Sequence, residues 1–145
     1  MAAVIVEPVL GEGGYVVPPA SFLPRLREIT RELGILLIVD EVQTGFGRTG
    51  KMFAVQHQNV EPDILVMAKG IASGFPFSAL GTRRELDDKW PKGSHGGTYG
   101  GNAMGCAAAL ATIDVMSEPG FFENVRARGA QLSDAIRGLQ ESFPV

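Results

Sequence analysis

An amine and a carboxylate both stand at the ends of apolar runs, where the two groups could do chemistry together. Lys69 ends the run from Ile64 to Ala68 and is followed at once by glycine and a loop of small residues. A lysine that is buried in such a place has a lowered pKa, because desolvation disfavours its charged form. A neutral amine beside a cavity is a nucleophile, and its characteristic use is a Schiff base with a carbonyl compound. The alternative is an ordinary lysine that leaves a strand into water, because lysine is almost never fully buried.

The matching carboxylate is Asp40, which follows five apolar residues in the run at 35–42 (ILLIVDEV). A carboxylate in such surroundings needs a cationic partner. Asp40 and Lys69 lie one strand–helix–strand unit apart, and if their strands are neighbours, about 4.8 Å apart, both side chains can face one crevice. A buried ion pair would satisfy both groups. Pyridoxal phosphate needs the same pair, since it binds a lysine and requires a carboxylate that keeps its ring nitrogen protonated.

Apolar runs along the whole chain predict the strands that must carry these residues. Short runs that are rich in β-branched residues and bounded by proline or glycine are typical of buried strands. The runs predict strands at 2–9, 35–42, 64–68 and 77–82. Helical patterns lie between the first three of them, the second pattern being a short helix at 52–58. This alternation is typical of an α/β fold with a mainly parallel sheet and covering helices.

Three longer helices are expected. The first begins near Ser21, ends at Gly34, and has an apolar face that predicts its buried side. That face consists of Phe22, Leu26, Ile29 and Leu33. The helix at 103–116 is apolar on nearly every side, which predicts that it is buried, with Asn102 as its N-cap. The helix at about 121–142 has one apolar stripe, which predicts packing along its length.

The composition excludes several classes of partner. The chain has 145 residues with a net charge of −3, so no nucleic-acid partner is expected. No apolar run reaches the roughly 18–20 residues of a membrane span, and no signal peptide precedes the first strand, so no membrane partner is expected. The single cysteine, Cys106, is consistent with a reducing compartment, and we expect a cytoplasmic protein without a metal site.

Four motifs follow one another along the chain. They are Glu7-Pro8 followed by GEGG at 11–14, DEVQTGFGRTG at 40–50, AKG at 68–70 and GTYGGN at 97–102. Together they resemble the class III pyridoxal-phosphate aminotransferases, nearest the 4-aminobutyrate (ω-amino acid) branch. The resemblance runs from residue 3 to the end of the chain. It implies the large domain of fold-type-I enzymes and the transfer of an amino group from an ω-amino acid to a 2-oxo acid.

The resemblance also implies a role for each matching residue. Lys69 would form the Schiff base with the cofactor and move a proton between the substrate carbon and the cofactor. Asp40 would pair with the pyridine nitrogen. Val42 would pack against one face of the ring, and Gln43 would reach the phenolic oxygen of the ring. The alternative for Val42 is a core residue without a role in the function.

Two more residues have roles only through the resemblance. Thr98 resembles the threonine that holds the phosphate of the neighbouring subunit's cofactor, which implies a homodimer. Glu7 resembles the glutamate that pairs with a substrate-side arginine in ω-amino acid and ornithine enzymes. The alternatives are a loop hydroxyl for Thr98 and a strand-end carboxylate with a structural partner for Glu7.

The resemblance implies that the chain is a central segment, incomplete at both ends. Residues 1–118 would be part of the cofactor-binding large domain, and residues 119–145 a helix leading toward a C-terminal small domain. The phosphate cradle and the substrate arginine would then lie elsewhere, so an alternative is a non-catalytic fragment. The sequence departs from the family at Ala103, where the family usually has proline.

Other functions share some of these features. Acetylornithine aminotransferase, ornithine aminotransferase and glutamate-1-semialdehyde aminomutase belong to neighbouring branches, so the amino donor stays open. A different class of function is a nucleotide-binding module through Gly45–Lys51 (GFGRTGK), which follows a strand. Met52 stands where a phosphate loop needs serine or threonine for magnesium, and two acidic residues precede the loop.

Overall fold

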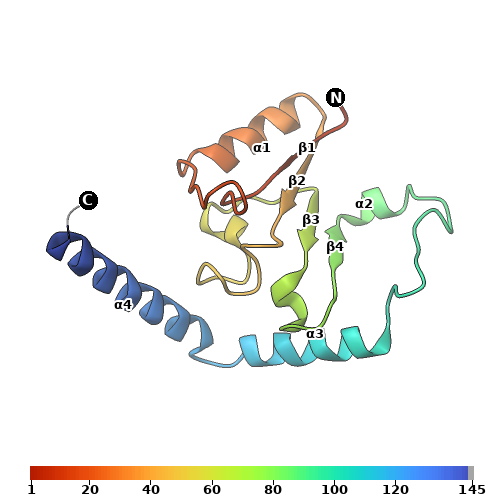
Figure 1. Cartoon of the computed structure of the whole chain (residues 1–145). Coiled ribbons are helices and arrows are strands. Elements are labelled where there is room, and N and C mark those ends of the chain that lie inside the picture. Colours follow the sequence, from red (N-terminus) through yellow and green to blue (C-terminus); the bar gives the residue numbers. More distant parts are fainter. Residues whose placement is uncertain (144–145) are drawn as a thin grey trace.

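A four-stranded sheet forms the centre of the computed structural model, which describes residues 1–143 (Figure 1). The strands are β1 (Ala3–Val6), β2 (Leu36–Asp40), β3 (Ile64–Met67) and β4 (Ala79–Thr82). Their order is β1-β2-β3-β4, and the pairs β1–β2 and β2–β3 are parallel. The predicted α/β fold with a mainly parallel sheet is therefore confirmed.

The fourth strand runs antiparallel to β3. A parallel neighbour needs a crossover of a dozen or more residues, usually with a helix. The connection at 68–78 contains only the single 3₁₀ turn η2 (Lys69–Ala72) and a loop, so the chain reverses instead. A second short element, α2 (Arg84–Asp87), follows β4 and was not expected from the sequence.

Helix α1 (Phe22–Glu32) covers one face of the sheet (Figure 1). Leu23 of this helix packs with Leu37 and Val39 of β2 in a core that also contains Val55 and Val60. Val55 belongs to η1 (Ala54–His57), a 3₁₀ helix within the predicted helical segment at 52–58.

The prediction for the buried face of α1 was wrong in part, because Leu26 packs against the core and Ile29 is half-buried, but the fully buried residues are others. The helix buries Leu23, Arg27 and Thr30, whereas Phe22 and Leu33 are exposed. The physical reason is an ion pair, since the Arg27 guanidinium donates to Asp63 Oδ2 at 2.6 Å under the helix. A buried Asp63 requires such a partner, and the pairing turns the helix toward its polar side.

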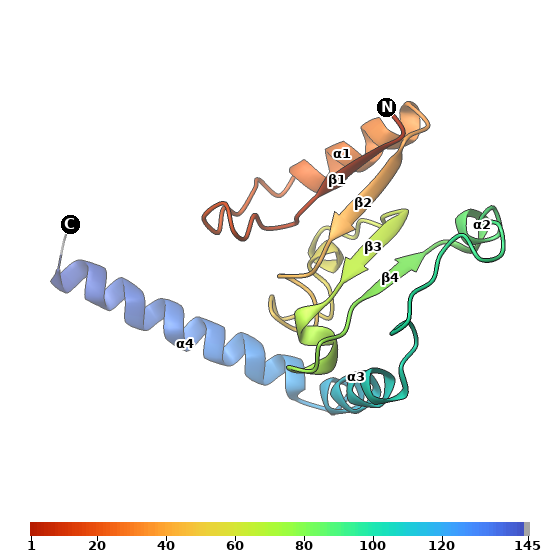
Figure 2. The same cartoon turned by 45° about the vertical axis from the view of Figure 1, so that its right-hand side comes forward.

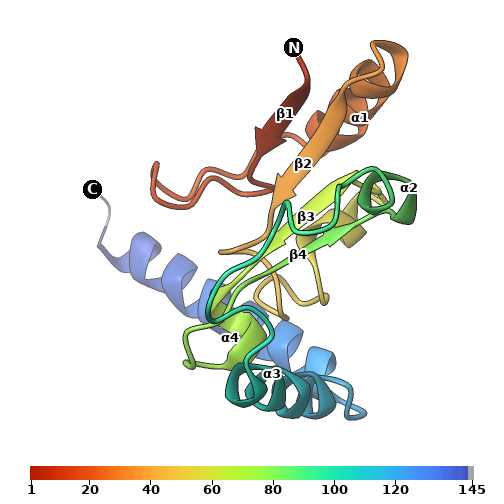
Figure 3. The ribbon, with the colours of Figure 1, turned by 90° about the vertical axis from the view of Figure 1, so that its right-hand side faces the viewer.

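A second core lies beyond the carboxyl ends of the parallel strands. It is formed by η2, helix α3 (Ala103–Met116), the first turn of α4 (Phe121–Ser142) and the loop that carries Phe46 (Figure 3). Asn102 caps α3 as predicted, because its Oδ1 accepts from the Gly105 amide at 2.7 Å. The alanine at 103 is compatible with this cap.

Two burial predictions for the last helices were wrong within this chain. Helix α3 buries only Gly105, Ala109 and Met116, because it packs on η2 along one side and leaves its other side exposed. Helix α4 buries no residue and projects away from the sheet (Figure 1). Residues 144–145 of the expected C-terminal segment lie outside the described residues. Within residues 1–143, no helix combines the length and the apolar character that crossing a membrane requires.

Candidate active site

Three of the candidate residues lie at one edge of the sheet. Glu7 follows β1, Asp40 ends β2, and Lys69 lies two residues beyond the end of β3. The arrowheads of β2 and β3 point to this edge in Figure 2, where η2 also lies. Ligands of open α/β sheets bind beyond the carboxyl ends of parallel strands. The condition that the strands of Asp40 and Lys69 are neighbours is therefore met.

Asp40 is half-buried and its carboxylate has a fixed orientation. Its Oδ1 accepts a hydrogen bond from the Val42 amide at 2.9 Å. Asp40 pairs in register with Val66. Among residues 1–143 no ion pair involves Asp40. A carboxylate without a cation beside apolar strands fits a ligand that brings a positive charge, such as a protonated ring nitrogen.

Lys69 differs from the expectation of a buried amine. It is exposed, and it starts η2 with a φ of 47°. A left-handed conformation in a residue other than glycine costs about 1–3 kcal/mol and is concentrated at functional sites. The described part of the chain offers the Lys69 amine no hydrogen bond or ion pair. The amine is therefore available for a bond to a ligand beyond the strand ends.

Glu7 and Gln43 meet around Gly11, beside Asp40. Glu7 Oε2 accepts from the Gly11 amide at 2.9 Å, and Gln43 Nε2 donates to Glu12 Oε1 at 3.2 Å. A Cβ at Gly11 would lie 2.9 Å from Gln43 Cγ and 3.1 Å from Glu7 Oε2, so any larger residue would displace these two side chains. Glu7 and Asp40 line one cavity of about 480 Å³.

Val42 lines a different, mostly apolar groove of about 720 Å³. The groove runs over the sheet face opposite α1, where Ile38 and Val66 form its floor. Ile5 borders both this groove and the cavity that contains Asp40. A flat aromatic ring next to Asp40 would have an apolar surface at Val42, as the resemblance implies. Lys69 lines neither of these two cavities. Lys69, Asp40 and Val42 fit pyridoxal phosphate by their chemistry, because they supply an amine, a carboxylate and an apolar surface at the same end of the sheet.

Thr98 lies apart from this group. It belongs to the exposed loop at 91–101 and lines a separate cavity of about 620 Å³ with residues 76–78. Neither Asp40 nor Lys69 borders that cavity. This position does not place Thr98 at the cofactor site of its own chain.

Sequence reasoning missed two buried carboxylates. Glu41 is fully buried and accepts from the Thr44 hydroxyl and from two backbone amides. Strand alternation could have revealed it, because Glu41 follows Asp40 and must point to the opposite, covered face. Asp63 stands directly before β3, and the sequence signal for its burial is the position of Arg27 on the same helix stripe as Leu23.

The environment of Asp63 sets its charge. Burial alone would raise the pKa of this carboxyl, but the Leu37 amide, Arg27 and Arg83 stabilise the charged form and lower the pKa below its ordinary value. Asp63 thus joins α1, β2 and the end of β4. It supports the sheet at the edge opposite the candidate site.

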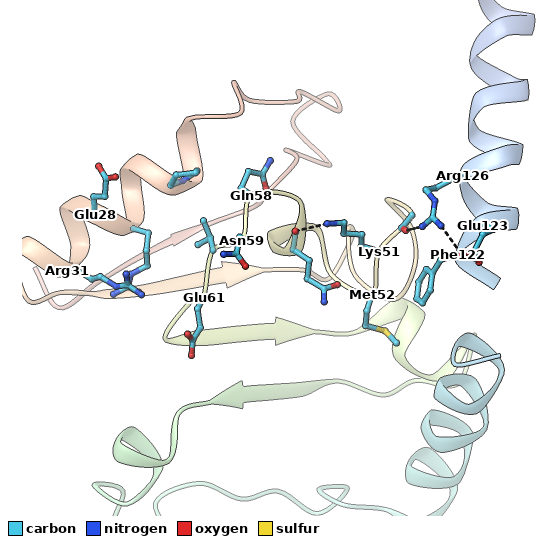
Figure 4. Close-up of a pocket in the computed structure, with 15 residues that line it drawn as sticks. Glu28, Arg31, Lys51, Met52, Gln58, Asn59, Glu61, Phe122, Glu123 and Arg126 are labelled. Carbon is cyan, nitrogen blue, oxygen red and sulfur yellow. Dashed lines mark hydrogen bonds and ion pairs between the residues drawn. The ribbon is translucent and has the colours of Figure 1, made fainter. Parts of the chain in front are cut away.

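A cavity of about 1030 Å³ lies away from Asp40 and Lys69. It lies between α1, the loop at 50–61 and the start of α4 (Figure 4). None of the residues assigned to the pyridoxal phosphate site lines it, whereas Gly50 and Lys51 of the glycine loop at 45–51 do. The glycine loop beside it is packed: Gly45, Gly47 and Gly50 are buried, and Phe121, Phe122 and Arg126 lie against the last two of them. A packed loop argues against a nucleotide-phosphate cradle.

Comparison with known proteins decides the family. The class-III aminotransferase family matches the chain over residues 1–145. The chain belongs to the class-III aminotransferase family. An ornithine aminotransferase from Oceanobacillus iheyensis is 47% identical over 95% of this aminotransferase chain and 35% of its own length. A 4-aminobutyrate aminotransferase from Mycobacterium tuberculosis is 46% identical over 97% of the chain and 32% of its own length.

Solved aminotransferase structures share the fold. The ornithine aminotransferase from Toxoplasma gondii ME49 superimposes with a TM-score of 0.92 at 40% identity, over 98% of this chain and 34% of that one. An (S)-enantioselective ω-transaminase from Thermomicrobium roseum superimposes with a TM-score of 0.88 at 44% identity. The match covers 96% of this chain and 32% of that one. A T. gondii ornithine aminotransferase has partial occupancy of pyridoxal phosphate at its active site. This aminotransferase chain spans about a third of the length of these relatives.

Proposed function

We propose that the protein containing this chain transfers an amino group from an ω-amino acid, such as 4-aminobutyrate, to a 2-oxo acid, such as 2-oxoglutarate. The observation that supports this proposal is the placement of Asp40 and Lys69 after neighbouring parallel strands, at the same edge of the sheet. Family membership supports the reaction class and the cofactor, pyridoxal phosphate.

Each residue of this chain has a task in the proposal. When bound, pyridoxal phosphate supplies a reactive aldehyde carbon and a ring that accepts electrons. Lys69 would hold the cofactor at that carbon and would carry a proton to and from the substrate carbon. Asp40 would keep a proton on the ring nitrogen. Val42 would lie on one ring face and Gln43 at the phenolic oxygen.

The assembly is part of the proposal. Thr98 lies on an exposed loop, outside the cavities that contain Asp40 and Val42. A residue in that position suits a contact with the cofactor phosphate of a second copy, so we infer a homodimer. Residues 1–118 would belong to the cofactor-binding domain and residues 119–145 to a connection toward a small domain. The single cysteine favours a cytoplasmic location.

Glu7 is the candidate residue for contact with the amino donor. Its carboxylate shares a cavity with Asp40, which places a charged group close to any amino donor bound there. The alternatives are the terminal amines of ornithine and acetylornithine, because relatives with both of those names match the chain. Glutamate-1-semialdehyde is a further alternative. Initial rates of the complete protein with each donor and 2-oxoglutarate, where a co-substrate is needed, would decide among them.

Lys69 is tested by chemical labelling. The complete protein is incubated with pyridoxal phosphate, reduced with borohydride and digested, and the modified peptide is mapped by mass spectrometry. We expect the label on Lys69 and its loss in Lys69→Ala, together with loss of transamination. Lys51→Ala is the matched control and should keep both the label on Lys69 and the transamination activity. A label that persists in Lys69→Ala would reject the assignment.

A further inference from the structure

Glu41 is a buried carboxylate that the proposed reaction does not use. Within residues 1–143 it has no cationic partner. Its carboxylate instead accepts from the Thr44 hydroxyl at 2.5 Å, the Ala54 amide at 3.0 Å and the Val55 amide at 2.9 Å. Bonds of this kind to a charged acceptor are about twice as strong as those between neutral groups. Glu41 therefore joins the turn after β2 firmly to η1.

The backbone of Glu41 holds the same turn from two sides. Its amide donates to the Val66 carbonyl of β3 at 2.9 Å, and its carbonyl accepts from the Gly45 amide at 2.9 Å. The turn is tight, because a Cβ at Gly45 would lie 2.8 Å from the Glu41 carbonyl oxygen. These backbone bonds tie the turn at 41–46 to β3, and the side-chain bonds of Glu41 tie the same turn to η1.

This turn reaches both candidate residues. At its start, the Asp40 carboxylate accepts from the Val42 amide. At its end, Phe46 is 8% exposed, and a Cβ at Gly70 would lie 2.9 Å from Phe46 Cβ. Gly70 is the residue after Lys69. A shift of the turn would therefore change the placement of Asp40 directly and that of Lys69 through Gly70.

We propose that Glu41 is a positioning residue of the cofactor site. Its buried carboxylate fixes the turn at 41–46 and thereby the relative placement of Asp40 and Lys69. The inference rests on the proposed function, because it assigns Glu41 a task only if those two residues hold pyridoxal phosphate.

The test is Glu41→Gln in the complete protein. A glutamine keeps the shape but has one acceptor oxygen, so at least one of the three donors loses its bond and faces an amide N–H. In the cofactor-free protein we expect faster hydrogen exchange at the Ala54 and Val55 amides. We also expect roughly tenfold weaker binding of pyridoxal phosphate, from the loss of one bond to a charged group, and a shifted pH midpoint of the bound cofactor's absorbance.

Two further variants sharpen the test. Thr44→Val removes one donor and leaves the Glu41 carboxylate in place, so it should weaken the binding of pyridoxal phosphate by about threefold. If Glu41→Gln does not fold, the Thr44→Val variant still tests whether Glu41 positions the cofactor site. Glu61→Gln replaces an exposed carboxylate that makes no ion pair within residues 1–143, and this control should leave affinity, absorbance and exchange unchanged.

The outcomes separate this inference from the proposed function. Faster exchange at Ala54 and Val55 with unchanged affinity and absorbance profile would overturn it, because Glu41 would then stabilise η1 only. The proposed function survives that result if the unaltered protein is still labelled on Lys69. If the unaltered protein binds no pyridoxal phosphate, the proposed function fails and the inference fails with it. Equal changes in Glu61→Gln would also overturn the inference.

Discussion

Asp40 and Lys69 are held in different ways, although they stand at the same edge of the sheet. The Asp40 carboxylate is half-buried and oriented by the Val42 amide. Lys69 is exposed and begins its 3₁₀ turn in a left-handed conformation. A carboxylate with a fixed orientation suits the role of keeping a proton on one atom of a ligand. A long side chain with fewer contacts suits an amine that must reach more than one carbon.

Asp40→Asn tests the role of the carboxylate. An amide cannot keep a proton on the ring nitrogen, so we expect transamination by the complete protein to fall by about 10²-fold or more. The label on Lys69 should persist, since it does not require the ring proton. Steady-state rates and peptide mapping measure the two effects separately. Asp88→Asn, at an exposed carboxylate, is the control, and an unchanged rate in Asp40→Asn would contradict the assignment.

At the scale of elements, one carboxylate joins helix α1 to the sheet. Asp63 accepts from Arg27 and from the Leu37 amide, and it also pairs with Arg83. These contacts lower the pKa of the Asp63 carboxyl, against the opposing effect of burial. A lowered pKa in the folded state adds stability above the ordinary aspartate pKa, which is about 3.9, and this stability is lost as the pH falls through the folded value.

Asp63→Asn tests this link. At pH 7 we expect the free energy of unfolding to fall by about 3–5 kcal/mol, because the substitution leaves Arg27 buried without a compensating charge. Between pH 5 and the acid range, the variant should lose less stability than the unaltered chain, since it lacks the titrating group. Urea unfolding at each pH measures both effects. Asp134→Asn, which removes an exposed ion pair with Arg137, should change neither.

At the scale of the whole molecule, α4 stands apart from the rest. Phe121, Phe122 and Arg126 connect its first turns to the loop at 47–50. Beyond them the helix projects from the sheet (Figure 1), with Leu132 and Leu139 about 60% exposed. The stability of this chain therefore depends on the start of α4 and not on its end.

Shortened chains test this division. A chain that ends at residue 130 should have the same free energy of unfolding as the full 145 residues, within about 0.5 kcal/mol, because residues 131–143 are all exposed. A chain that ends at residue 120 should be clearly less stable, since it loses both phenylalanines and the bond from Arg126 to the Gly50 carbonyl. A large loss in the longer of the two chains would show that the end of α4 is packed in solution.

Much of this protein was predictable from local pattern. The apolar runs identified all four strands, and Asn102 and Gly120 border the two long helices near the expected positions. Asp40 and Lys69 could be singled out because a charged residue at the end of an apolar run is costly unless it has a task. Their common edge followed from the rule that parallel strands end on the same side.

Only the tertiary structure decided which sides were buried. A local pattern records hydrophobicity, whereas burial depends on partners far away in the sequence. Arg27 is buried because Asp63 lies beneath it, and Glu41 is buried because η1 supplies two amides to its carboxylate. Lys69 is exposed because the chain turns into η2 instead of extending the strand. The sequence thus determined the elements and the candidate chemistry, and long-range contacts determined how that chemistry is supported.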